Sequence, residues 1–438
     1  MARTEECILY RNFDNGEVLD IMTSLMNSYE AGEEGFENRK EEFFHMAGSL
    51  VEMAGMYGFS GNLWHTYLTQ LLVNHENAFS TASEIRGAVE GSINHLALHD
   101  FGIFKELYDF DLAVFDSAFG TDCADFLCNY VNTGCNSKVY NQRICDRICD
   151  MSKTLAVAKD TNEFMAEMVQ VYKDFGVGKL GLHKAFRIDH DQNGRAVIVP
   201  VTRIAHVQLE DLVGYEIPKQ KLVENTEAFV RGRKANNCLL FGDAGTGKSS
   251  SIKGILNKYY DEGLRIIEVY KHQFVDLNQI IAQIKDRNYK FIIYMDDLSF
   301  EEFEIEYKYL KAVIEGGLER KPENILIYAT SNRRHLVRER AGDKLEVGAD
   351  DDIHSSDTVQ EKLSLVYRFG VRIYFGAPDR KEFHTIVKTL AQRNGITMPE
   401  DELLLEAGKW EISHGGLTGR TAQQFIDHLL GKEETQEA

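Results

Sequence analysis

The stretch GDAGTGKS, from Gly242 to Ser249, has the glycine, lysine and hydroxyl spacing of a phosphate-binding loop. It follows the apolar run NCLLF and precedes the helical pattern SIKGILNKYY, which is the strand–loop–helix context that this motif requires. Glycines let backbone N–H groups turn toward a phosphate chain, and the helix N-terminus adds its dipole. We predict that Lys248 reaches the β- and γ-phosphates of a nucleotide and that Ser249 ligates Mg²⁺. The expected nucleotide-binding residues in this stretch are Gly242, Asp243, Ala244, Gly245, Thr246, Gly247, Lys248, Ser249 and Ser250.

A run of carboxylates, MDDLSFEEFE, begins at Met295 directly after the apolar residues FIIY. A buried strand there would present Asp296 and Asp297 at its carboxyl end, the edge of an open α/β sheet where ligands bind. A phosphate loop needs such an acidic residue to organise Mg²⁺. We therefore predict that Asp296 lies beside the metal with Ser249, and that Asp297 orients or activates the attacking water.

Polar residues also follow the later apolar runs. Asn332 ends the run NILIYATSN, where it can hold the attacking water or the γ-phosphate. Arg368 lies in YRFG before the last expected strand, and Arg420 lies in GGLTGR at the start of an expected helix. Two arginines after the core suit a γ-phosphate sensor in cis and a finger supplied to a neighbouring subunit in trans. Upstream, Val213 and Tyr215 are placed to lie against an adenine ring.

Simpler interpretations exist for the arginines. Arg368 and Arg420 could be surface ion-pairing residues, which contribute little. Arg333 and Arg334 could contact a neighbouring subunit or nucleic acid, but solvated or ion-paired side chains explain them better.

The elements that must position these residues differ between the two halves of the chain. None of the five prolines precedes Pro200, and helical spacing of apolar residues recurs in EVLDIMTSLMNSY, KEEFFHMAGSLVEMAG, NLWHTYLTQLLVNH and TNEFMAEMVQVYKDF. We predict an all-helical N-terminal domain over residues 1–199, with the extended stretch AVIVPVTRI leading out of it.

From residue 200 the pattern changes. Short β-branched runs such as RIIEVY and VRIYFGAP alternate with helical patterns, which predicts an α/β core over residues 200–378, with a parallel sheet and helices on both faces. Residues 379–438 read as a small helical lid that ends in the polar tail GKEETQEA.

Composition limits the class of protein. The 438 residues carry a net charge of −20, most of it in the first 200 residues, and this argues against general nucleic-acid binding by the N-terminal half. Neither a signal-peptide core nor an apolar run of membrane-spanning length is present, so a cytoplasmic protein without a membrane anchor is expected. Five of the seven cysteines cluster without a CxxC pair; buried thiols are expected, with a metal site as the alternative. The five are Cys123, Cys128, Cys135, Cys145 and Cys149.

Taken in order, these motifs resemble those of AAA+ ATPases of the P-loop superfamily. The stretches DLVGYE, NTEAFVRGRKANNCLLFGDAGTGKSS, GLRIIEV, MDDLSFEEFE, ATSNRRHL, EKLSL, RFG and TGR resemble the bacterial AAA+ family known as domain-of-unknown-function family 815. The resemblance covers about residues 200–430 and is weaker before them, mainly at GVGKLGLHKAFRI. It implies binding and hydrolysis of ATP with Mg²⁺, and assembly into a homo-oligomer such as a hexamer.

Carried over by position, the resemblance makes Asp296 and Asp297 the Walker B pair and Asn332 sensor 1, with Thr330 as a nearby substitute. It makes Arg368 the arginine finger and Arg420 sensor 2. Two departures stand out. Many AAA+ proteins have Asp-Glu where this chain has Asp-Asp, and VYRFG stands where the family favours SDRFG.

The shorter second aspartate leaves open which carboxylate handles the water. Glu301 and Glu302 are alternatives to Asp297, whereas Glu304 fits a solvated helix face. The main functional hypothesis is an ATPase that remodels an unknown protein partner bound by the N-terminal domain. The alternatives are a slow ATP-gated switch or scaffold, and a DNA-associated loader or helper.

Overall fold

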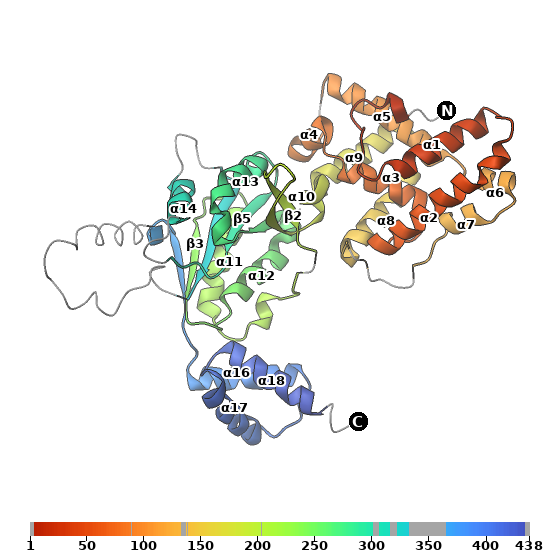
Figure 1. Ribbon diagram of the computed structural model, residues 1–438. Coiled ribbons are helices and arrows are strands. Elements are labelled where there is room, and N and C mark those ends of the chain that lie inside the picture. Colours follow the sequence, from red (N-terminus) through yellow and green to blue (C-terminus); the bar gives the residue numbers. More distant parts are fainter. Residues whose placement is uncertain are drawn as a thin grey trace. The chain divides into compact units, whose positions relative to one another are not determined.

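The computed structural model describes residues 4–88, 90–132, 137, 139–202, 204–300, 306–315, 322–332 and 365–433. The chain divides into two compact units, Met1–His183 and Lys184–Ala438 (Figure 1). Among the described residues, no helix combines the length and the apolar character needed to span a membrane.

All the named elements in the described part of the first unit are helices, as the spacing of apolar residues predicted. Asn and Asp side chains cap several of its helices: the Asn62 side chain accepts a hydrogen bond from the His65 backbone N–H at 3.0 Å, and Asp160 caps the ninth helix in the same way. The helices are α1 (Glu17–Glu30), α2 (Lys40–Tyr57), α3 (Leu63–Asn74), α4 (Ala78–Arg86), α5 (Ser92–Asp109), α6 (Ala113–Phe119), α7 (Cys123–Cys128), α8 (Gln142–Ala156), α9 (Thr161–Phe175) and α10 (Gly178–Leu182).

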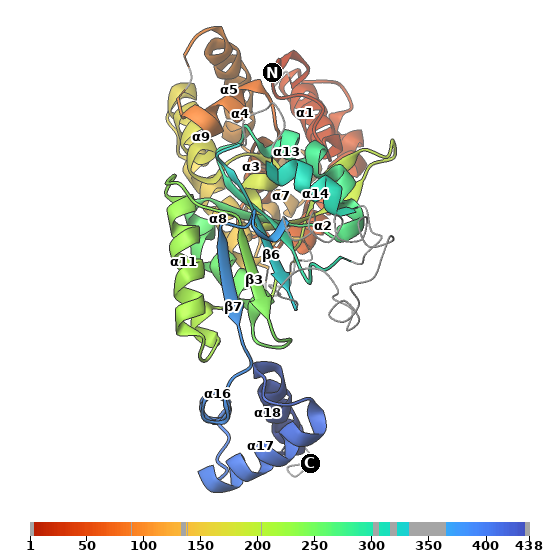
Figure 2. The same ribbon diagram turned by 90° about the vertical axis from the view of Figure 1, so that its left-hand side faces the viewer.

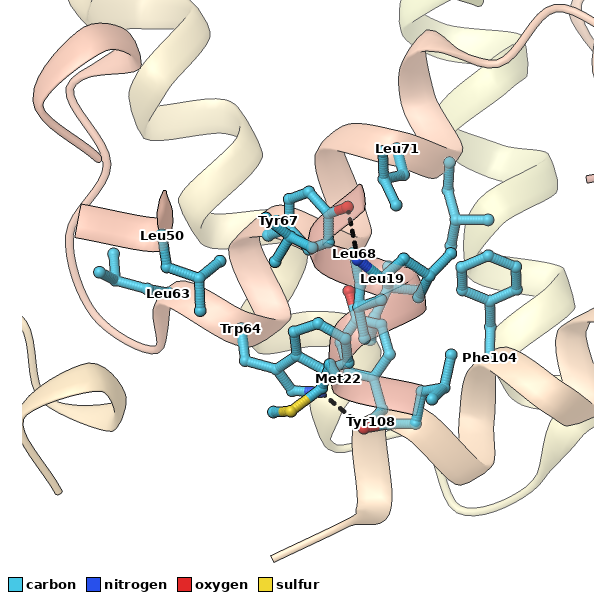
Figure 3. Packing of buried hydrophobic residues seen from close by; sticks show 14 of the residues in the cluster. Leu19, Met22, Leu50, Leu63, Trp64, Tyr67, Leu68, Leu71, Phe104 and Tyr108 are labelled. Carbon is cyan, nitrogen blue, oxygen red and sulfur yellow. Dashed lines mark hydrogen bonds between the residues drawn. The ribbon is translucent and has the colours of Figure 1, made fainter. Parts of the chain in front are cut away.

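Helix α3 is the centre of this unit, because every residue from Leu63 to Val73 is buried except His65. Figure 3 shows its aromatic side chains packed against α1 and α5. The Trp64 indole N–H donates to the Leu107 carbonyl at 2.9 Å, and the Tyr67 hydroxyl accepts from the Leu19 N–H at 3.1 Å. The polar atoms of these two aromatic side chains thus have partners inside the core.

The clustered cysteines are part of this helical packing. Cys145 is buried in α8, and its thiol donates to the Tyr57 carbonyl at 2.7 Å. Burial is also the main cause of the raised thiol pKa values of Cys123, Cys128 and Cys149. Within the described ranges no three His, Cys, Asp or Glu side chains are grouped so that they could hold a metal ion. Cys135 lies outside those ranges.

The second unit is built on a seven-stranded sheet in the order β2-β1-β4-β5-β6-β3-β7. All neighbouring strands are parallel except β1 and β2. The strands are β1 (Ala185–His190), β2 (Ala196–Pro200), β3 (Cys238–Gly242), β4 (Leu264–Glu268), β5 (Lys290–Met295), β6 (Ile325–Ser331) and β7 (Val371–Phe375).

Helices cover both faces of this sheet. Apolar side chains of α11 (Glu216–Val230) and α12 (Lys248–Tyr259) form one cluster with the sheet, whereas α13 (Leu277–Ile284) and α14 (Glu306–Glu315) lie on the other side from α11 (Figure 2). The helices α16 (Arg380–Arg393), α17 (Glu400–His414) and α18 (Gly419–Glu433) share a separate apolar cluster and form the lid. The structure therefore confirms the predicted fold class, an α/β core with a helical lid after an all-helical region.

The division between the units does not fall at residue 199, where the sequence placed it. Residues 184–199 lie in the second unit, because β1 pairs in parallel with β4 (Phe186 opposite Ile267) and antiparallel with β2 (Ile188 opposite Ile198). Their inward-facing side chains are almost wholly buried. This strand pair extends the sheet beyond the expected core.

Candidate nucleotide site

The phosphate loop connects β3 to α12, the strand–loop–helix arrangement that the sequence predicted. Gly242 ends β3 with φ +134°, and a Cβ there would lie 2.0 Å from the Phe375 carbonyl oxygen on β7. Gly245 and Gly247 have φ +74° and +87°, the left-handed region that glycine enters freely. Helix α12 begins at Lys248, so the loop ends at a helix N-terminus.

Lys248 is 6% exposed and folds back on the loop. Its Nζ donates to the Gly242 carbonyl at 3.0 Å and to the Asp243 carbonyl at 2.6 Å. Burial lowers the pKa of this ammonium, although the carboxylates of Asp243 and Asp297 act in the opposite direction. A phosphate chain beside Lys248 would compensate the charge that burial penalises.

Asp296 collects three hydroxyl groups on one carboxylate oxygen. Its Oδ1 accepts hydrogen bonds from Ser249 at 2.7 Å, Tyr294 at 2.7 Å and Thr330 at 2.5 Å. Burial of this carboxyl raises its pKa, but the hydroxyl donors outweigh burial, so that the net pKa is lowered and Asp296 is charged at neutral pH. The two residues expected beside Mg²⁺, Ser249 and Asp296, are thus in direct contact.

Tyr294 was missed by the sequence analysis. The usable signal is strand alternation, because residues i and i+2 of a strand lie on the same face and Tyr294 is two residues before Asp296. Burial raises the pKa of the Tyr294 phenol well above its ordinary value, so it stays a proton donor to Asp296.

Asp297 takes a left-handed backbone conformation with φ +50°. Its backbone N–H donates to Thr330 Oγ1 at 2.9 Å, and its Oδ1 accepts from the Asn332 side chain at 2.8 Å. Thr330 therefore connects the two aspartates, and Asn332 holds the second one. Glu301, Glu302, Arg333 and Arg334 lie outside the described residues.

The lid reaches this site through the first turn of α18. The Arg420 backbone N–H donates to the Gly245 carbonyl at 3.2 Å, and a Cβ on Gly245 would meet Arg420 Cβ at 3.1 Å. Glycine suits this position, because its φ of +74° strains other residues and a Cβ would press on the lid. Arg420 is accordingly brought together with the phosphate loop.

The segment before α11 forms another wall. Val213 packs against the apolar cluster of the lid, and the Tyr215 ring lies 5.5 Å from the ring of Phe375. The Tyr215 hydroxyl is buried and has no hydrogen-bond partner in the described part of the chain. Burial raises its pKa to about 12, so it remains a neutral O–H group.

These residues enclose one cavity of about 690 Å³. Every expected site residue among the described residues lines this cavity except Gly242, Asp243 and Arg368. Each of these three lies outside the cavity for a different reason. Gly242 is under β7, and the Asp243 carboxylate accepts the Ala377 backbone N–H at 2.8 Å. Arg368 instead forms an ion pair with Glu315 of α14. The lining residues include Val213, Tyr215, Ala244, Gly245, Thr246, Gly247, Lys248, Ser249, Ser250, Asp296, Asp297, Thr330, Asn332, Arg420 and Gln423.

Comparison with known proteins assigns the second unit to a family. Residues 181–433 match the family described as "Protein of unknown function (DUF815)". The chain belongs to this family. The matched residues include the phosphate loop, the whole seven-stranded sheet and the lid. No curated protein matched the sequence.

Solved structures of RuvB from Thermotoga maritima are similar over part of the chain. One variant has 17% sequence identity and a TM-score of 0.38, and the match covers 53% of this chain and 67% of that protein. A second structure, described as the RuvB Holliday junction branch migration motor, has 15% identity and a TM-score of 0.32, with 51% and 72% covered.

Proposed function

We propose that this member of the family is an ATPase that hydrolyses ATP with Mg²⁺ in the cavity between the phosphate loop, the carboxyl ends of β5 and β6, and the lid. The observation that carries the proposal is the contact of Ser249 with Asp296 beside Lys248. This pair provides a hydroxyl and a carboxylate oxygen, ligands that suit Mg²⁺, a hard cation held in such sites with few protein ligands and the substrate phosphates.

The residues around Ser249 and Asp296 would have different roles in the reaction. Lys248 and Arg420 would bind phosphate charge, and Asp297, with Asn332, would orient the attacking water. A bound Mg²⁺ would add neutralisation of the phosphate oxygens. On the base side, Val213 offers an apolar wall and the Tyr215 hydroxyl offers a free donor for a ring nitrogen of adenine.

The direct test replaces Lys248 by alanine. We expect ATP binding to weaken by about 10- to 100-fold, because a charge-assisted contact to phosphate is lost, and turnover to fall with it. Titration calorimetry and phosphate release measure both. Lys253→Ala is the matched control, since Lys253 is an exposed lysine of the same helix. Normal turnover in Lys248→Ala would remove the basis of the proposal.

One contact favours a second candidate function, a slow ATP-gated switch. Asn332 donates a hydrogen bond to Asp297. An aspartate side chain is shorter than a glutamate side chain, so its carboxylate reaches less far toward a water. In Asp297→Glu, a rise in kcat of about tenfold or more would indicate that the native protein is a switch, because the longer base then restores the reach to water. Unchanged or lower turnover would favour the ATPase.

We further propose that the protein works as a homo-oligomer and that its helical unit recognises a protein partner. Arg368 sits outside the cavity, which suits a finger that acts on a neighbouring subunit. Arg368→Ala should keep ATP binding and lose turnover only at protein concentrations at which sedimentation shows an oligomer. Normal turnover by a monomer would rule the finger out. Affinity capture with Asp297→Asn, which should retain ATP, would identify the partner; recovery of DNA instead would favour the loader hypothesis.

A further inference from the structure

The segment Leu209–Val213, here termed the strap, runs between the sheet and the lid. At one end Leu209 is buried in the apolar cluster of α12, where a Cβ on Gly254 would lie 2.9 Å from its side chain. At the other end Val213 packs against the apolar cluster of the lid. The strap therefore packs both against the core that surrounds the sheet and against the lid.

Three consecutive carbonyls of the strap accept hydrogen bonds from cationic side chains. Arg393 donates from Nη2 to the Glu210 carbonyl at 2.8 Å and from Nη1 to the Asp211 carbonyl at 2.9 Å. Lys219 donates to the Leu212 carbonyl at 2.7 Å. Arg393 is the last residue of α16 in the lid, and Lys219 belongs to α11 beside the sheet.

The strap lies between two cavities. Asp211, Leu212 and Val213 line the nucleotide cavity, and a Cβ on Gly247 of the phosphate loop would meet Leu212 at 3.3 Å. Arg393 and Lys219 line a second cavity of about 500 Å³, which shares Leu212 and Val213 with the first. Arg393 and Lys219 thus bind the backbone of the strap on the side of the second cavity. Residues of the strap also form a wall of the nucleotide cavity.

We propose that Arg393 is a positioning residue for nucleotide binding: its guanidinium fixes the strap to the lid and thereby preforms the wall that receives the base. This inference rests on the proposed ATP site. A guanidinium presents two donors in one plane, which matches two successive carbonyls, whereas a lysine ammonium holds only one well. A wall that is ordered before binding lowers the entropy cost of binding.

The experiment compares ATP with inorganic tripolyphosphate, which has the phosphate chain but no base, by calorimetric titration of the full-length protein. In Arg393→Ala we expect about fivefold weaker ATP binding, the equivalent of one net hydrogen bond, and unchanged tripolyphosphate binding. KM for ATP should rise by the same factor while kcat at saturation stays. Arg393→Lys should recover part of the loss. Lys388→Ala is the control, because Lys388 lies on the same helix and pairs with Glu400 within the lid.

Two results would overturn the inference. One is wild-type ATP affinity in Arg393→Ala, and the other is an equal loss for ATP and tripolyphosphate, which would mean general damage to the site. Failure of the ATP site itself has a different signature, namely native protein that binds neither ligand, or ligand binding that is unchanged in Lys248→Ala.

Discussion

At Asp296, a single carboxylate oxygen accepts three O–H groups that come from the phosphate loop, from β5 and from β6. Each donor favours the charged form of the carboxyl, and together they keep it ionised despite its partial burial. The same contacts fix the side chain before any ligand arrives. Folding therefore already orients the side chain that we propose as a metal ligand.

This arrangement predicts a pH-dependent effect of Tyr294→Phe. Because the pKa of Asp296 is lowered in the folded state, its contribution to stability is present above the unfolded pKa of about 4 and is lost as the pH falls through the lower folded value. We expect the variant to lose about 1 kcal/mol in the free energy of unfolding at pH 7 and less at pH 3. Urea unfolding at the two pH values measures the difference.

A matched control is Tyr328→Phe on β6. The Tyr328 hydroxyl bonds to Thr226 and Asn225 and contacts no carboxylate among its hydrogen-bond partners. Its loss should therefore be similar at both pH values. An equal loss for Tyr294→Phe at pH 7 and pH 3 would contradict the role assigned to the phenol.

At this scale the sequence indicates which residues belong to the site better than how they contact one another. The spacing of Gly245, Lys248 and Ser249 predicts a phosphate loop because backbone geometry demands those residue types. The contact of Thr330 with Asp296, and that of Asn332 with Asp297, depend on the relative height of the neighbouring strands β5 and β6. That register is a tertiary property which local patterns do not carry.

Among the elements, β3 and β7 lie so close together at Gly242 that a side chain does not fit between them. Gly242 has a φ that only glycine adopts readily, and any Cβ there would overlap the Phe375 carbonyl. The start of the phosphate loop thus requires a residue without a Cβ at position 242.

We expect Gly242→Ala to destabilise the protein by about 3 kcal/mol or more, because backbone strain and a backbone clash add. Gly263→Ala is the control: Gly263 has φ +92° but nothing within 4 Å of a Cβ, so only the strain of about 1 kcal/mol applies. Denaturant midpoints compare the two variants. A loss in Gly242→Ala no larger than that of the control would show that β7 can move away.

Element prediction succeeded where patterns were long. The four patterns with helical spacing in the first unit lie on α1, α2, α3 and α9, as predicted. The apolar runs KFIIYM and ILIYATS form the buried strands β5 and β6. Strand β1, AFRIDH, has only two inward apolar residues, Phe186 and Ile188. Its place in the sheet comes from pairing with β4, a segment far away in sequence, so no local signal assigned it to the core.

At the scale of the whole molecule, the division after His183 has a measurable consequence. A fragment of residues 184–438 keeps the complete sheet and should bind ATP within about twofold of the full chain, because every residue that lines the nucleotide cavity lies in this unit. A fragment of residues 200–438 lacks β1 and nearly all of β2, which exposes the edge of β4 and the buried Ile266 and Ile267. Exposed edges of this kind aggregate.

Size-exclusion chromatography and ATP titration of the two fragments test this boundary. Equal solubility and stability of the shorter fragment would show that β1 and β2 are dispensable for the fold of the second unit. The first unit, residues 1–183, should fold as a helical protein because its apolar core is complete without the sheet.

The buried thiols can report how often the structure of each unit opens. A reagent can reach Cys145 of α8, or Cys238 of β3, only when the surrounding structure opens, since burial both shields the sulfur and raises its pKa in the case of Cys238. The labelling rate of each cysteine therefore measures how often the structure of its own unit opens. A nucleotide bound beside β3 should slow the labelling of Cys238 and leave the labelling rate of Cys145 unchanged.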